Sequence, residues 1–175
     1  MDTFFEQIVS VKKTAKSWLI IFGIIFAAII VSFALLLLGM SFLRGFFMII
    51  LLLIFGVFYG AWQVIIRQSV EYEYIVTNGS MDVDRIVAQR SRKRVLSFEL
   101  SAVEQVEKYN PAAPPVGNYS KTVIACSQNA EDAYYMVVSS EAKGTRLLVF
   151  APDDRLKDAI AKSLPRFIAN SAFKN

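Results

Sequence analysis

Residues 72–100 read YEYIVTNGSMDVDRIVAQRSRKRVLSFEL, and this stretch decides the fold of the part of the chain that follows it. Apolar side chains alternate along residues 72–76, resume at 81–83 and return at 96–100, which is the period of half-buried β-strands. Asn78-Gly79 lies between the first two runs, and this pair is a strong hairpin signal because both turn positions need positive φ. The stretch therefore predicts three antiparallel strands.

Two uncharged apolar runs precede these strands. They cover residues 18–40 and 46–66, and only SFLRG separates them. The chain as a whole is 55% hydrophobic with a mean hydropathy of +0.44, which is high for a soluble domain. Each run is long enough to cross a hydrocarbon core of about 30 Å. We therefore expect a transmembrane helical hairpin over residues 18–66.

The basic residues around the two runs indicate their orientation. Lys12, Lys13 and Lys16 precede the first run and Arg67 follows the second, whereas the loop holds only Arg44. Lysine and arginine are enriched on the cytoplasmic side of spans. The sequence thus predicts a two-span protein of the cell membrane with both termini in the cytoplasm.

The residues inside the runs favour helix packing over transport. Charged side chains at membrane depth usually mark ion paths, and these runs contain no Asp, Glu, Lys or Arg. Small residues that let helices approach closely occur as the pairs Gly23 and Ala27, and Gly56 and Gly60. We expect these pairs to pack the two helices of one hairpin together. The alternative is a homo-oligomer formed through the second helix.

The segment 1–17 resembles a short amphipathic helix. Thr3 and Glu6 have the spacing of a capping box, and apolar residues follow at helical intervals. Such a helix would lie in the membrane interface or dock on the domain that follows. The sequence leaves both arrangements open.

The rest of the chain predicts a small β domain over residues 70–165. A turn or a fourth strand is expected near Val103 and Val106. Three more strands are expected at 122–127, 133–139 and 145–150, after a proline-rich loop at 109–121. Pro152 and Asp153 open a helix that Pro165 ends, and residues 166–175 form a frayed tail. The fold class is α+β: a transmembrane hairpin, then a curled antiparallel sheet or small barrel covered by a C-terminal helix.

Two patterns in this domain resemble a known fold. Y-x-Y-x-V-T-N-G opens the first strand, and Leu100-Ser101 is followed by Val103 and Val106. This order is similar to that of bacterial pleckstrin-homology-like (PH-like) domains, which are often attached to transmembrane helices. The full chain, from MDTF to VEYEYIVTNGSMDVDRIVAQR, also resembles a two-span membrane family of anaerobic Gram-positive bacteria. That resemblance implies no activity and no catalytic residues.

The densest charge cluster is the strongest candidate for a contact site. Arg85, Arg90, Arg92, Lys93 and Arg94 are expected near the connection between the second and third strands. Each basic residue near an anionic membrane contributes about 1 kcal/mol of attraction. The alternative is a solvated loop balanced by nearby glutamates.

Little in the sequence supports catalysis. Asp82 and Asp84 have the D-x-D spacing of metal-dependent transferases, but alternate residues of a strand simply share its solvent face. The chain has no histidine, and its single cysteine, Cys126, is expected in the core. Acidic residues nearly balance the basic ones, which argues against nucleic acid.

We therefore predict a non-catalytic membrane-anchored binding or scaffolding module without metal or cofactor. Its partner would be a protein, a peptide or anionic lipid head groups. The alternatives are a metal-dependent membrane transferase and an accessory subunit of a pore or transporter.

Overall fold

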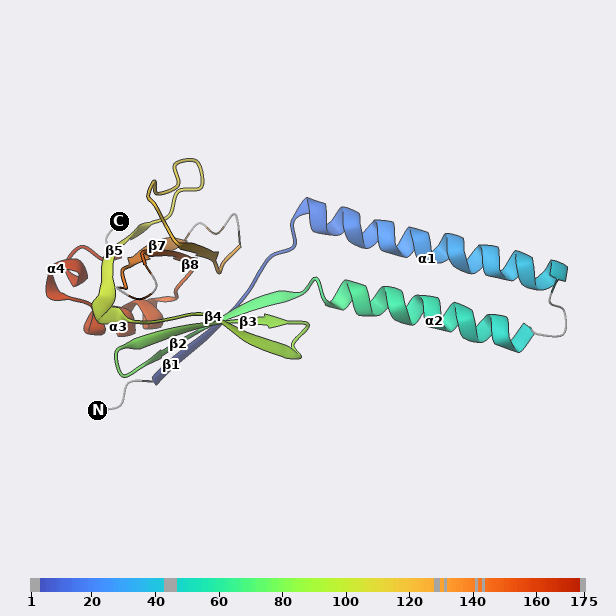
Figure 1. The fold of residues 1–175 in the computed structure, drawn as a ribbon, viewed down its shortest axis with the longest axis horizontal. Coiled ribbons are helices and arrows are strands. Elements are labelled where there is room, and N and C mark those ends of the chain that lie inside the picture. Colours follow the sequence, from blue (N-terminus) through green and yellow to red (C-terminus); the bar gives the residue numbers. More distant parts are fainter. Residues whose placement is uncertain are drawn as a thin grey trace. The chain divides into compact units, whose positions relative to one another are not determined.

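The computed structural model describes residues 4–42, 47–127, 130, 132–140, 142 and 144–173 (Figure 1). The chain forms two compact units. One comprises residues 12–69 and the other combines the residues up to Val11 with those from Val70 onward. The β domain is therefore discontinuous in sequence.

The first of these units consists of the helices α1 (Ala15–Phe42) and α2 (Phe47–Ile66). By length and composition, both are long and apolar enough to cross a membrane. Most of their large apolar side chains are exposed, so they are not core helices of a globular unit. The first helix begins three residues before the predicted Trp18. Most of the predicted loop, including Arg44, lies outside the described residues.

The two helices do not pack through the predicted small pairs. Gly23, Ala27, Gly56 and Gly60 are all exposed, and a Cβ added at any of the three glycines would meet no atom within 4 Å. The buried face of α1 instead carries Ile21, Ala28, Ser32 and Gly39. A Cβ on Gly39 would overlap the side chain of Ile50. The close approach is made at Gly39 because its face, and not that of the predicted pairs, points at α2. The alternative of a homo-oligomer through Gly56 and Gly60 stays a prediction.

The N-terminal segment is a strand, not the predicted amphipathic helix. Phe4–Ser10 forms β1 and pairs antiparallel with β2 (Val70–Thr77), from Phe4 opposite Thr77 to Ser10 opposite Glu71. A helix this short is marginal in water, whereas as a strand the segment forms backbone hydrogen bonds with β2 along its length. The predicted capping interaction of Thr3 falls outside the described residues.

Sheet A is an antiparallel meander in the order β1-β2-β3-β4, with β3 at Ser80–Val87 and β4 at Ser91–Glu99. The predicted hairpin turn is confirmed, since Asn78 and Gly79 have φ of 47° and 86°. Val83 pairs with Leu96 and Asp84 pairs with Arg94, so Val95 is an extra residue in a β-bulge.

Sheet B contains the strands β5 (Val103–Lys108), β6 (Lys121–Ile124), β7 (Tyr134–Val138) and β8 (Arg146–Phe150). A short 3-10 turn, Leu100–Ala102, leads into it from sheet A. The spatial order is β5-β7-β8-β6, and β6 runs parallel to β8. This parallel pair departs from the predicted all-antiparallel arrangement. β7 forms two places away from β6, and β8 then runs antiparallel to β7 and fills the place between β7 and β6.

The core lies between the two sheets, which do not close into a barrel. Tyr74, Phe150, Met136 and Leu148 are among its fully buried side chains. The predicted C-terminal helix is confirmed as α3 (Asp154–Ser163), and Asp153 caps it by accepting a 2.8 Å hydrogen bond from the Leu156 amide.

The C-terminal residues are not a frayed tail as far as the structure describes them. Arg166–Ala169 forms the short helix α4, and Ile168 and Ala172 are buried in the main core. Their apolar side chains cover sheet surface that α3 leaves open, which explains why the chain stays ordered past Pro165.

Candidate functional site

The outer face of sheet A carries a row of ion pairs. Because side chains alternate along a strand, Glu73, Asp84 and Arg94 lie side by side on this face, in the register Glu73–Asp84–Arg94. Arg92 bonds Glu73 at 2.8 Å. Arg92 and Arg94 of the predicted basic cluster therefore have acidic partners, and both lie within β4 and not in a loop.

Asp82 and Asp84 are held by one arginine. The Arg94 guanidinium contacts Asp82 at 2.9 Å and Asp84 at 3.0 Å, and the bond to Asp84 raises the pKa of Arg94. Asp84 is buried, which corrects the expectation that both carboxylates face solvent. Within the described residues no group of three or more potential ligands gathers to hold a metal ion. The geometry is that of a structural ion-pair network.

Glu73 is the most deeply buried charged group of this network. Its side chain has no exposed surface, and one carboxylate oxygen has no hydrogen-bond partner. Burial raises the pKa of Glu73, the neighbouring Glu6 carboxyl raises it further, and Arg92 opposes both. In the sequence, Glu73 only continues the alternation of its strand, so no pattern distinguished it as a buried acid.

The remaining three basic residues surround the turn between β3 and β4. We call the turn Val87–Ser91 with Arg85, Arg90 and Lys93 the hairpin tip. These three side chains are exposed, and in the described part of the chain none forms an ion pair. Arg85 and Lys93 are direct cross-strand partners. Like charges in that position repel each other, so an anion near the tip would stabilise it.

The backbone of the hairpin tip is strained. Ala88 and Gln89 have φ of 55° and 54°, and the Arg90 amide bonds the Val87 carbonyl at 3.1 Å. The left-handed region costs a non-glycine residue about 1–2 kcal/mol, and such positions concentrate at functional sites. Neither residue is one that favours this conformation, so sequence patterns did not reveal the turn type.

The expected core position of Cys126 is confirmed. Cys126 is buried, and burial raises the pKa of its thiol to about 11, which makes it a poor nucleophile. Tyr74, Tyr134 and Tyr135 are buried as well. The Tyr135 hydroxyl donates a 2.7 Å bond to Glu107, and this bond lowers the pKa of Glu107.

Sequence reasoning also missed two cations, Lys121 and Arg146, at the starts of β6 and β8. They lie far from the basic cluster in sequence, and only the pairing of β6 with β8 makes them register partners. A lone arginine before an apolar run carries no pattern that would have identified it.

Comparison with known proteins identifies one family. The family model described as "Bacterial PH-like domain (DUF6106)" matches residues 1–170. No curated protein and no solved structure matches the chain. The matched range includes β1, the two apolar helices and the strands that follow them.

Proposed function

The chain belongs to this family of bacterial PH-like domains, and on that premise we propose that it is a non-catalytic membrane-anchored binding module. In this proposal α1 and α2 hold the protein in the cell membrane, and the hairpin tip binds anionic lipid head groups at the cytoplasmic face.

The register of sheet A is the observation that carries the proposal. Val87 lies opposite Val70, and Ser10 lies opposite Glu71. The hairpin tip is therefore at the same end of sheet A as the points where the chain leaves for α1 and returns from α2. Residues 11–14 and 67–69 are the only links, so this end of the sheet is tethered within a few residues of both apolar helices.

Electrostatics supports contact at this end. Three basic side chains without ion-pair partners would contribute about 3 kcal/mol at most to attraction by an anionic surface, at about 1 kcal/mol each. Such a weak contact matters in a tethered domain, because the tether supplies a high effective concentration. The links to the apolar helices contain further basic residues, Lys12, Lys13 and Arg67.

The strand pairing also constrains topology. β1 precedes the two helices and β2 follows them, yet the two strands share one sheet. If both helices cross the bilayer, the N-terminus and the domain must lie on the same side, and the flanking lysines favour the cytoplasm. Reporter fusions before residue 1 and after residue 175 should both be active only in the cytoplasm. A signal from opposite sides would contradict the paired strands.

The non-catalytic part of the proposal is supported by the ion pairs of Asp82 and Asp84. A divalent ion would have to displace Arg94 from both carboxylates. The variant Arg94→Gln should therefore gain divalent-ion affinity relative to the parent, as measured by calorimetry. Tight binding already in the parent would revive the transferase alternative.

The lipid contact is tested with the full chain in nanodiscs. Ser91, which is exposed at the hairpin tip, is changed to cysteine in a Cys126→Ala background and carries an environment-sensitive fluorophore. We expect quenching by head-group spin labels to be stronger with phosphatidylglycerol than with phosphatidylcholine, and to weaken as salt rises.

The matched variants separate a specific contact from bulk charge. Changing Arg85, Arg90 and Lys93 to glutamine should abolish the preference for anionic lipid. Changing three exposed cations elsewhere, Lys108, Arg155 and Lys162, removes the same charge and should preserve the preference. Equal quenching in both lipids, or equal effects of the two triple variants, would refute the proposed contact.

A further inference from the structure

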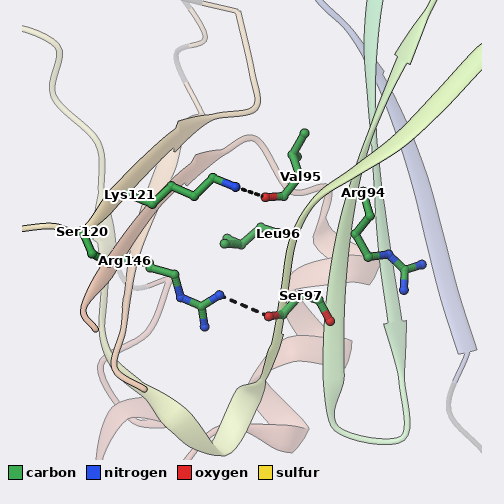
Figure 2. Close-up of a pocket in the computed structure, with 7 residues that line it drawn as sticks. All are labelled: Arg94, Val95, Leu96, Ser97, Ser120, Lys121 and Arg146. Atoms are coloured by element: carbon green, nitrogen blue, oxygen red, sulfur yellow. Dashed lines mark hydrogen bonds between the residues drawn. The ribbon is translucent and has the colours of Figure 1, made fainter. Parts of the chain in front are cut away.

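A second basic site lies between the two sheets, away from the hairpin tip. The edge of β4 in sheet A faces the starts of β6 and β8 in sheet B across a cavity of about 560 Å³ (Figure 2). The cavity is partly open to solvent. Its lining consists of Arg94, Val95, Leu96, Ser97, Ser120, Lys121 and Arg146.

Two cations reach across this cavity. The Lys121 ammonium donates to the carbonyl of Val95, and Nη1 of Arg146 donates to the carbonyl of Ser97 at 3.3 Å. Figure 2 shows both side chains extending from sheet B toward β4, whereas Arg94 points away from the cavity toward its own ion pairs. Among the described lining residues, Lys121 and Arg146 are therefore the cations whose charges the cavity presents.

Arg146 is a buried charge without a counter-ion among the residues that the structure describes. Only 7% of the residue is exposed, and its Nε is enclosed without an acceptor. The described residues offer neither Arg146 nor Lys121 a carboxylate partner. Burying an unpaired ion costs several kcal/mol, and a single backbone carbonyl at 3.3 Å offsets little of it.

An oxyanion is the ligand that this arrangement lacks. The guanidinium has a planar fork of N–H donors that matches a phosphate, and a lysine ammonium binds the same group as a point charge. A dianionic phosphate would neutralise both cations at once. Lys121 is exposed, so it lies on the entry side, while Arg146 forms the buried end.

We propose that this cavity binds a phosphate group, with Arg146 as the anchoring residue and Lys121 as the entry residue. The phosphate is either free or the monoester head group of a lipid, since both present the same dianion. This site goes beyond the proposed lipid contact of the hairpin tip, because it shares no residue with it and stands if that contact fails.

The test measures how phosphate protects Lys121 from amine modification, with mass spectrometry of the full chain in dodecyl maltoside. Inorganic phosphate should slow the modification of Lys121 in a saturable manner and leave the exposed Lys108 unchanged. Sodium chloride at equal ionic strength should have no such effect. The same measurement in nanodiscs compares phosphatidic acid with phosphatidylglycerol, whose phosphate is a monoanionic diester.

Two variants test the role of Arg146. Arg146→Gln should raise the phosphate concentration for half protection by about tenfold or more, as expected for the loss of a charge-assisted partner. Arg146→Lys retains the charge and should lose less. Arg155→Gln, which removes an exposed arginine of α3, should behave as the parent. Alkylation of the buried Cys126 checks that each variant is folded.

Each outcome decides the proposal. Protection by inorganic phosphate that depends on Arg146 supports a free phosphate ligand, and protection only with phosphatidic acid supports a lipid source. No saturable protection of Lys121 in the parent, from either source, would overturn the proposal. Protection that is equal in Arg146→Gln, Arg146→Lys and the parent would also overturn it.

Discussion

Tyr74 joins the two sheets of the β domain, so the substitution Tyr74→Phe should lower the domain's free energy of unfolding. The Tyr74 hydroxyl donates a 2.5 Å bond to the Ala125 carbonyl and accepts a 3.3 Å bond from the Ala151 amide. Its ring packs edge-on against Phe150 with 5.8 Å between ring centroids. The substitution keeps this packing and removes only the two hydrogen bonds.

The expected cost follows from the two backbone groups that lose a partner. Ala125 is fully buried, so its carbonyl would remain unsatisfied at a cost of about 1–3 kcal/mol. Ala151 is partly exposed, so water can replace the hydroxyl there. We expect a loss of about 2 kcal/mol, which corresponds to a roughly 30-fold larger population of the open domain.

The single cysteine provides the assay. Cys126 is 5% exposed, so a maleimide reacts with it only when the domain opens. Labelling rates are compared for the full chain in dodecyl maltoside at low urea. Tyr72→Phe is the matched control, because Tyr72 lies in the same strand and its hydroxyl has no partner in the described structure. Equal labelling rates of the two variants would refute the reasoning.

Three further predictions concern other parts of the chain. Burial raises the pKa of Glu73 above 4.5, so the folded state holds its proton more tightly and stability should fall as pH rises through the raised pKa. The free energy of unfolding of Glu73→Gln, measured in urea at several pH values, should lack this part of the pH dependence. If the parent and the variant change in parallel with pH, the raised pKa of Glu73 is contradicted. Gln7→Ala should destabilise the domain by about 1–2 kcal/mol, because Gln7 bonds both the Ala151 carbonyl and the Asp153 amide, whereas Ser10→Ala should change little. Gly39→Leu should weaken the α1–α2 pair in an SDS titration followed by circular dichroism, and Gly56→Leu should not; the reverse result would favour packing through the predicted pairs.

Local patterns predicted most of the elements. Alternation, the Asn78-Gly79 turn and the proline-bounded helix depend on nearest neighbours along the chain, and the structure confirms each of them. The apolar runs were equally clear, because their length and lack of charge are properties of composition. The candidate site was predicted less well. Of the five clustered basic residues, Arg92 and Arg94 turned out to be ion-paired to acids on neighbouring strands.

The sequence by itself determined an apolar helical pair followed by a small α+β domain. Only the tertiary structure decided that Phe4–Ser10 belongs to that domain as β1, since a short alternating segment takes the conformation that its pairing partner offers. The same holds for charge. Whether a cation is paired, exposed or buried depends on strands that are distant in sequence, as Arg94, Arg85 and Arg146 respectively demonstrate. Contacts between distant residues leave no local period in the sequence, which is why the ion-pair network and the cavity between the sheets became visible only in three dimensions.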